Sequence, residues 1–209
     1  TDATWYNLSV DGDGAVWGAT TAGLVRFEPD SERTTVWTSA DGLLSDVVTG
    51  VLAASDGSVW VGHVADSTQQ GERVLVEGDT LTVTKAIDFT ESDEIAAVVA
   101  FGEQPWGKGL GDVWMGTNEG LCVWDADLDV FAEHAHPTHP HGYTEGVTFT
   151  PEGDIWNGDA YQLSRWRYSN DGDLSPGADL FETIPVWPVE LEEAISITDL
   201  DADGTDVWV

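Results

Sequence analysis

The sequence predicts an all-β fold built from repeated units of four antiparallel strands. One segment recurs five times, as an apolar strand, an Asp/Gly turn and a second strand in which an apolar residue precedes Trp. The five anchoring tryptophans, Trp17, Trp60, Trp114, Trp156 and Trp208, lie 43, 54, 42 and 52 residues apart. A blade of a β-propeller takes roughly 40 to 50 residues, so this spacing predicts four blades and the start of a fifth.

The first copy shows how each unit divides into strands. Its apolar and β-branched stretches predict strands over 6–10, 15–20, 23–27 and 34–38. The Asp-Gly pairs between the first two accept the positive φ angles of a tight hairpin. The predicted blades cover residues 5–40, 46–86, 94–133 and 143–184, with a fifth starting at 193–209, all in a single propeller region.

Two features interrupt the pattern. An insertion around residues 66–72 moves the third strand of the second blade to 73–76. Apolar residues at loosely helical spacing occur over 43–54 and 189–197. Both of these stretches lead into an Asp/Gly turn and an anchoring Trp, so each is interpreted as a loop followed by an inner strand.

The anchoring tryptophans have a structural explanation. A large flat side chain on the second strand fills the space between neighbouring blades, so we expect these residues in the core. Trp5, Trp106 and Trp187 lie outside the anchoring positions. All three are therefore candidate platforms for a ligand such as a sugar ring, and Trp106 and Trp187 are the predicted ligand-binding residues.

The charge excludes two classes of partner. The chain has 39 acidic and 7 basic residues, for a formal net charge of −32. Such a surface repels nucleic acid phosphates and anionic lipid headgroups. The longest apolar run, 95–101, is far shorter than the roughly 20 residues of a membrane-spanning helix. A high-salt or extracellular setting fits this composition, as do solvated acidic loops on an ordinary protein.

Cys122 is the only cysteine, so no disulfide can form within the chain. It lies in an apolar stretch that predicts a strand, where a small buried side chain is expected. Stability must therefore come from packing.

The first two copies resemble the two-component regulator propeller repeat. The matching stretches are 15–20, GLVRF at 23–27, VWT at 36–38, DGLLS at 41–45 and, in the third copy, GDVWMGTNEGLCVW at 111–124. The fourth copy, 140–156, is more similar to blades of the streptogramin lyase type. The first resemblance implies an extracytoplasmic ligand-sensing module, often for glycans, and the second implies a metal-assisted lyase. Both families have more blades, which implies part of a larger ring of about seven blades.

A histidine cluster is the densest set of potential metal ligands. His134 and His136 alternate along a predicted strand and could share a transition metal such as zinc, while His139 and His141 could complete the site. The interleaved prolines instead favour an exposed loop without metal. His63 occupies the place of Thr20 and Thr117 at a strand end, where it could bind a ligand or cap the strand.

The last copy contains a second candidate metal site. Asp199, Asp201 and Asp203 fit the start of a calcium loop, D-x-D-x-D-G. The same residues fall in a hairpin turn, for which acidic residues need no metal.

Other catalytic signatures are absent from the sequence: it has no phosphate-binding glycine loop, nucleophile elbow or paired-cysteine zinc motif. The preferred hypothesis is therefore an extracellular or periplasmic propeller without catalysis, which binds a glycan, a small molecule or another protein chain. The alternatives are a metal-dependent lyase or hydrolase using His134–His141, and a structural subunit of an extracellular assembly.

Overall fold

The computed structural model of the protein describes residues 3–64, 69–88, 97–107, 109–135, 144–158, 162–167, 180–185, 200–203 and 206–208. These residues form β-strands and turns, with one short 3-10 helix, Ser39–Asp41, and no α-helix. The described part holds no helix that is long and apolar enough to cross a membrane. The chain divides into two compact units, Thr1–Val99 and Ala100–Val209.

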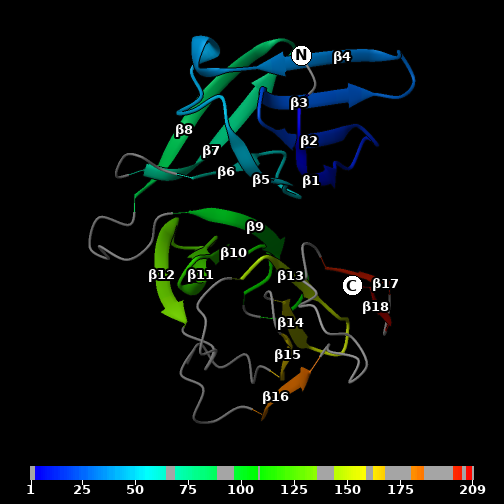
Figure 1. Cartoon of the computed structure of the whole chain (residues 1–209), viewed down its shortest axis with the longest axis vertical. Coiled ribbons are helices and arrows are strands. Elements are labelled where there is room, and N and C mark those ends of the chain that lie inside the picture. The colour runs from blue at the N-terminus through cyan, green and yellow to red at the C-terminus, as the bar shows by residue number, and fades with distance from the viewer. Residues whose placement is uncertain are drawn as a thin grey trace, which may run out of the picture. The chain divides into compact units, whose positions relative to one another are not determined.

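The first unit contains two antiparallel four-stranded sheets, each with its strands in sequence order (Figure 1). The strands of the first sheet are β1 (Trp5–Val10), β2 (Val16–Thr20), β3 (Gly23–Glu28) and β4 (Arg33–Trp37). Those of the second sheet are β5 (Val48–Ala53), β6 (Val59–His63), β7 (Gln69–Glu77) and β8 (Thr80–Asp88). The two sheets repeat one topology.

The second unit repeats this topology twice more. Its strands are β9 (Val98–Glu103, which starts at the boundary), β10 (Val113–Thr117), β11 (Gly120–Asp125) and β12 (Val130–Ala135), then β13 (Gly146–Phe149), β14 (Asp154–Gly158), β15 (Gln162–Arg167) and β16 (Leu180–Pro185). A two-stranded sheet of β17 (Asp201–Asp203) and β18 (Asp206–Trp208) follows.

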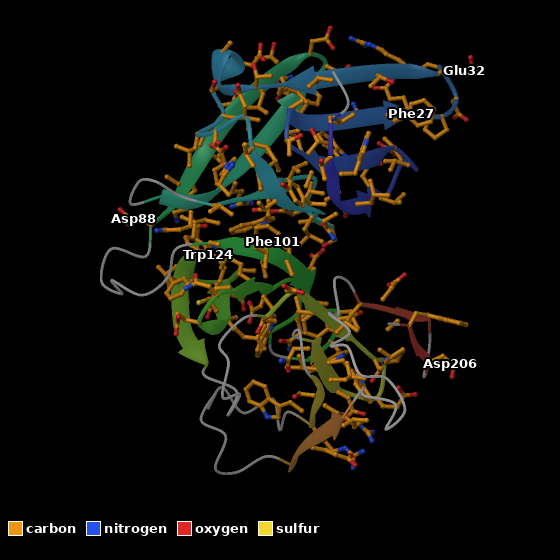
Figure 2. The ribbon with its side chains drawn as sticks, in the orientation of Figure 1. Phe27, Glu32, Asp88, Phe101, Trp124 and Asp206 are labelled. Carbon is orange, nitrogen blue, oxygen red and sulfur yellow. The ribbon has the colours of Figure 1, made fainter. Side chains whose placement is uncertain are left out.

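Tight turns join the first two strands in three of the four sheets. Gly14, Gly57 and Gly153 occupy the same place in these turns, and their φ angles are 83°, 83° and 97°. A glycine takes this left-handed conformation without the Cβ clash of other residues. Between the third and fourth strands, Glu32 (Figure 2) and Asp129 adopt φ angles of 53° and 54° although neither is glycine.

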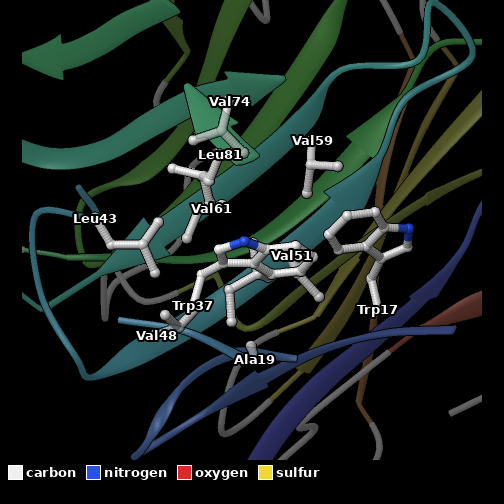
Figure 3. Close-up of a cluster of buried hydrophobic side chains, with 11 residues drawn as sticks. Trp17, Ala19, Trp37, Leu43, Val48, Val51, Val59, Val61, Val74 and Leu81 are labelled. Atoms are coloured by element: carbon white, nitrogen blue, oxygen red, sulfur yellow. The ribbon is translucent and has the colours of Figure 1, made fainter. Parts of the chain in front are cut away.

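Within each unit, a core lies between the two four-stranded sheets and contains anchoring tryptophans. In the first unit, the rings of Trp17 and Trp37 stack with centroids 5.7 Å apart, and they pack against Val51 and Val59 of the second sheet (Figure 3). In the second unit, Trp114 meets Phe149 and Trp166 edge to face, at 6.1 and 5.8 Å. Trp156 packs with Leu163, Leu200 and Val207. Trp60 is buried, whereas Trp208 is 64% exposed.

The structure departs from two sequence expectations. The third strand of the second sheet starts at Gln69 rather than Arg73, because β7 and β8 form a hairpin of nine-residue strands. Residues 39–41 form a 3-10 turn that the repeat does not predict, capped by Thr38 and followed by Gly42 at φ 113°. Residues 48–53 form strand β5, as expected, and 189–197 lie outside the described residues.

Candidate functional site

A buried histidine and a buried glutamate form a hydrogen-bonded pair in the second sheet. His63 lies at the end of β6 and is 1% exposed, and Glu72 lies on β7 and is fully buried. His63 Nε2 is 3.0 Å from Glu72 Oε1. The other ring nitrogen, Nδ1, is 3.0 Å from the carbonyl oxygen of Val47.

Glu72 occupies a register position that is not charged in any other described sheet. It lies opposite Val61, the residue after the anchoring Trp60. The residues at the same position in the other three sheets are Val25, Cys122 and Ser164, all buried. Burying an ionisable pair carries a desolvation cost that Val25, Cys122 and Ser164 do not have, so Glu72 is an energetically costly residue at this position.

His63 likewise differs from its counterparts. Thr20 and Thr117 end the second strand of their sheets, and their hydroxyls donate to the carbonyls of Gly23 and Gly120 at 2.8 and 2.9 Å. These bonds close the short turn to the third strand. His63 instead bonds to Glu72 and to the chain that enters β5.

The pair fixes the backbone that leads from the first sheet into the second. The amide of Leu44 donates to Glu72 Oε1 at 3.1 Å, and the carbonyl of Val47 meets the His63 ring. Residues 42–47, which we call the entry segment, are therefore held at two points. Since Val48 pairs with His63, this segment lies at the edge of the second sheet where β5 begins and β6 ends.

The side chains of the entry segment divide between core and solvent. Leu43 is buried in the core of the first unit (Figure 3), whereas Leu44 and Val47 are 40% and 38% exposed. Asp46 accepts a hydrogen bond from the Ser39 amide at 2.8 Å. Hydrogen bonds from Ser39 lower the pKa of Asp46, which therefore stays ionised at neutral pH. The segment thus presents two apolar side chains on a fixed backbone.

In three sheets an arginine side chain lies over the anchoring tryptophan. Arg26, Arg73 and Arg165 lie over the rings of Trp17, Trp60 and Trp156, with the guanidinium carbons 5.3, 5.7 and 5.6 Å from the ring centroids. Each of these arginines is the cross-strand partner of its tryptophan. Each also pairs with an aspartate of the adjoining hairpin, namely Asp11, Asp56 and Asp154.

This arrangement assigns the covered tryptophans to structure rather than to sugar stacking. The sequence carries a signal for it, because Arg26 and Arg165 each lie nine residues after their tryptophan. The signal does not extend to Arg73, which the insertion displaces to thirteen residues after Trp60.

The two predicted ligand platforms have different outcomes. Trp106 is partly buried, its indole N–H donates to the carbonyl of Thr150 at 2.8 Å, and its ring meets Phe149 edge to face at 6.2 Å. It packs in the core of the second unit. Trp187 lies outside the described residues. Ligand binding by either residue, or by His63, stays a prediction.

The predicted metal ligands fall only partly within the structure. His134 lies on β12, where its backbone pairs with Cys122, and Asp201 and Asp203 lie on β17. His136, His139, His141 and Asp199 lie outside the described residues. Within the described ranges, no group of three or more His, Cys, Asp or Glu side chains is placed to hold a metal ion. Both metal sites stay predictions.

The fold resembles several solved structures at low sequence identity. The extracellular domain of the hybrid two-component system BT4673 from B. thetaiotaomicron aligns with a TM-score of 0.68 and 17% identity, over 100% of this chain and 26% of that one. Virginiamycin B lyase from Staphylococcus aureus aligns with a TM-score of 0.60 and 16% identity, over 87% of this chain and 55% of that one. The WD40 repeats of RRP9 align with a TM-score of 0.62 and 13% identity, over 87% and 51%.

Neither a protein-family model nor a curated protein matches the sequence. The structural likeness therefore establishes the fold. Both kinds of propeller that the repeats resemble occur among these structures, and the chain spans about a quarter of the sensor domain and about half of the lyase. The chain is a β-propeller of four-stranded antiparallel blades.

Proposed function

We propose that this chain is an extracytoplasmic propeller module that binds a glycan, a small molecule or a partner chain through the edge formed by its entry segment. One observation carries the proposal: Leu44 and Val47 expose their side chains while the buried His63–Glu72 pair fixes the backbone of the same two residues. A fixed backbone lowers the entropic cost of binding, and exposed apolar side chains supply contact area.

The cost of the pair supports a role beyond stability. Three other sheets fold with Val25, Cys122 or Ser164 in place of Glu72. A sequence that keeps a buried charge where an uncharged residue suffices departs from the local rule, and such departures are expected at functional sites.

Two further facts support the setting of the proposed module. The structural neighbours include the extracellular domain of a two-component system, and a net charge of −32 disfavours nucleic acid as a partner. On the first ground we propose that the module lies outside the cytoplasm. The net charge is also compatible with a high-salt environment, in which salt screens the repulsion between acidic side chains.

The proposal is tested by screening the intact protein against a glycan array and a panel of small metabolites, then measuring each hit by calorimetry. Leu44→Ser and Val47→Ser should each weaken binding by about tenfold, since each removes an apolar side chain that the bound ligand would cover. Leu128→Ser is the matched control, because Leu128 is 71% exposed on a turn of the third sheet. Equal binding by all three variants, or turnover of a hit, would contradict the proposal.

A metal-dependent lyase or hydrolase that uses His134, His136, His139 and His141 is the second candidate, favoured by the fold shared with virginiamycin B lyase. Elemental analysis of protein purified without a histidine tag tests it. Bound zinc or another transition metal that is lost in His136→Ala and His141→Ala would support this candidate, and metal-free protein would eliminate it.

A structural subunit is the third candidate, and an exposed apolar face favours it. Leu8 and Val10 on β1 are 56% and 62% exposed. The residues in the register position of Leu8 in two other sheets, Val51 and Val147, are 2% and 5% exposed because a neighbouring sheet covers them. Light scattering should then show association that Leu8→Asp abolishes. A monomer at high concentration would reject this candidate.

A further inference from the structure

We infer that the His63–Glu72 pair is a proton-dependent latch on the entry segment. The pair holds residues 42–47 only while it carries one proton more than a neutral imidazole and an ionised carboxylate. The inference concerns the free protein, and only its consequence for ligand binding rests on the function proposed above.

The proton count follows from the hydrogen bonds. The carbonyl of Val47 can only accept, so His63 Nδ1 must carry a hydrogen. A neutral imidazole then has a lone pair at Nε2, which would face an oxygen of an ionised Glu72 at 3.0 Å. That contact is a hydrogen bond only if a further proton lies between the two atoms, on either Nε2 or Oε1.

The Leu44 amide also bonds to the pair. It donates to the same oxygen, Glu72 Oε1, at 3.1 Å. The oxygen can accept from Leu44 whether the shared proton sits on the ring or on the carboxyl group. All three hydrogen bonds therefore coexist in the protonated pair. After loss of the proton, the neutral imidazole has one hydrogen for two acceptors, Glu72 Oε1 and the Val47 carbonyl, so one of its two bonds is lost.

No other charged side chain takes over this role among the described residues. The cross-strand partners of the pair are uncharged: Val48 lies opposite His63, and Val61 and Ala86 lie opposite Glu72. On the entry segment, Asp46 accepts from Ser39, and just before it Asp41 accepts from Thr38. The charged residues nearby on β7 and β8 are Arg73, which pairs with Asp56, and Lys85 and Asp88.

Deprotonation should therefore release the entry segment rather than unfold the unit. Glu72 Oε2 is buried and has no hydrogen-bond partner, so the deprotonated carboxylate would lack a second donor to stabilise it. Turning the side chain towards water would relieve this cost and break the bond to Leu44. The core residues of the first unit, such as Val61 and Val74, do not depend on the pair for their contacts.

Amide hydrogen exchange of the wild-type protein, read by NMR without ligand, tests the latch. Across a pH series, the protection factor of the Leu44 amide should fall by about tenfold per pH unit once the pair begins to lose its proton. The amides of Val61 and Val74 should keep their protection. The imidazole nitrogen shifts of His63 should change over the same pH range.

A double variant supplies the control. His63→Thr with Glu72→Val installs the residues that the first sheet carries at these positions, Thr20 and Val25. Replacing a buried ion pair by uncharged residues is often tolerated, and this variant should show a poorly protected Leu44 amide with no dependence on pH.

Three results would overturn the inference. The first is a Leu44 protection factor that does not change with pH in the wild type. The second is a loss of protection shared equally by Val61 and Val74, which would indicate unfolding of the sheet. The third is a pH dependence that survives in the double variant. None of these measurements uses a ligand, so they fail independently of the binding experiments with Leu44→Ser and Val47→Ser.

Discussion

At the scale of single residues, three arginines occupy equivalent places in their sheets. These three of the chain's seven basic residues lie over anchoring tryptophans and pair with hairpin aspartates. In the first sheet, Asp11 accepts hydrogen bonds from the Trp17 indole at 2.9 Å and from the Ala15 and Asp13 amides. One carboxylate thus links the turn, the ring and Arg26.

The protonation of Asp11 should affect stability at low pH. Partial burial raises its pKa, but the hydrogen bonds from Trp17, Ala15 and Asp13 and the charge of Arg26 outweigh burial and lower it overall. A lowered pKa means that the unfolded chain binds the proton more readily. The stabilisation is therefore present above the unfolded pKa near 3.9 and is lost as the pH falls through the lower folded value.

We expect Asp11→Asn to lower the free energy of unfolding by about 1 kcal/mol at neutral pH and to change it less near pH 3. Urea unfolding followed by tryptophan fluorescence at several pH values measures both effects. Asp13→Asn removes the same formal charge from an exposed neighbour and should leave the pH profile unchanged. An equal response of the two variants would show that net charge, rather than the bonds of Asp11, sets the profile.

At the scale of strands and sheets, the interface between the third and fourth sheets depends on side-chain size. A Cβ atom added at Gly116 on β10 would lie 2.5 Å from the carbonyl oxygen of Thr144 and 3.0 Å from the Cβ of Ala100. One of these neighbours is backbone, which cannot rotate away as a flexible side chain can. The strands therefore approach closely because glycine is present.

Gly116→Ala should accordingly destabilise the protein by about 1–3 kcal/mol through overpacking. Gly12→Ala is the matched control, since no atom lies within 4 Å of the added Cβ at that position. Chemical denaturation of the two variants compares them directly. Equal stabilities would mean that the interface can shift to admit a methyl group.

The same interface tests the role of the anchoring tryptophans. Trp114 is 1% exposed between two sheets, whereas Trp208 occupies the corresponding place in the last repeat and is 64% exposed. Trp114→Ala should cost about 3–5 kcal/mol, and Trp208→Ala should cost less than about 0.5 kcal/mol. Thermal unfolding of both variants measures the difference, and similar losses would refute a packing role specific to buried positions.

At the scale of the whole molecule, the sequence predicts the architecture because the repeat contains both periodic and local signals. Asp-Gly or Glu-Gly turns mark the first hairpin in three of the four sheets, and the tryptophan spacing marks the repeating unit. The sequence does not predict the His63–Glu72 pair, because the partner of His63 lies nine residues away on another strand, across an insertion. The chain has 39 acidic residues, so only the strand register singles out Glu72.

The acidic composition also shapes the stability of the molecule as a whole. The net charge of −32 on 209 residues destabilises the folded state, because folding brings the negatively charged side chains closer together and increases their repulsion. Salt shortens the screening length from about 10 Å at 0.1 M to about 3 Å at 1 M, which weakens repulsion between exposed carboxylates more than attraction within buried pairs.

We therefore expect the urea midpoint at neutral pH to rise steadily between about 0.1 M and about 1 M sodium chloride. Near the isoelectric pH of about 4.1 the net charge vanishes, so the same salt series should have little effect there. Circular dichroism in both series provides the measurement. If screening is the cause, potassium chloride and sodium chloride at equal ionic strength should give the same urea midpoint. Specific ion binding would give different midpoints in the two salts, and that result would contradict the screening explanation.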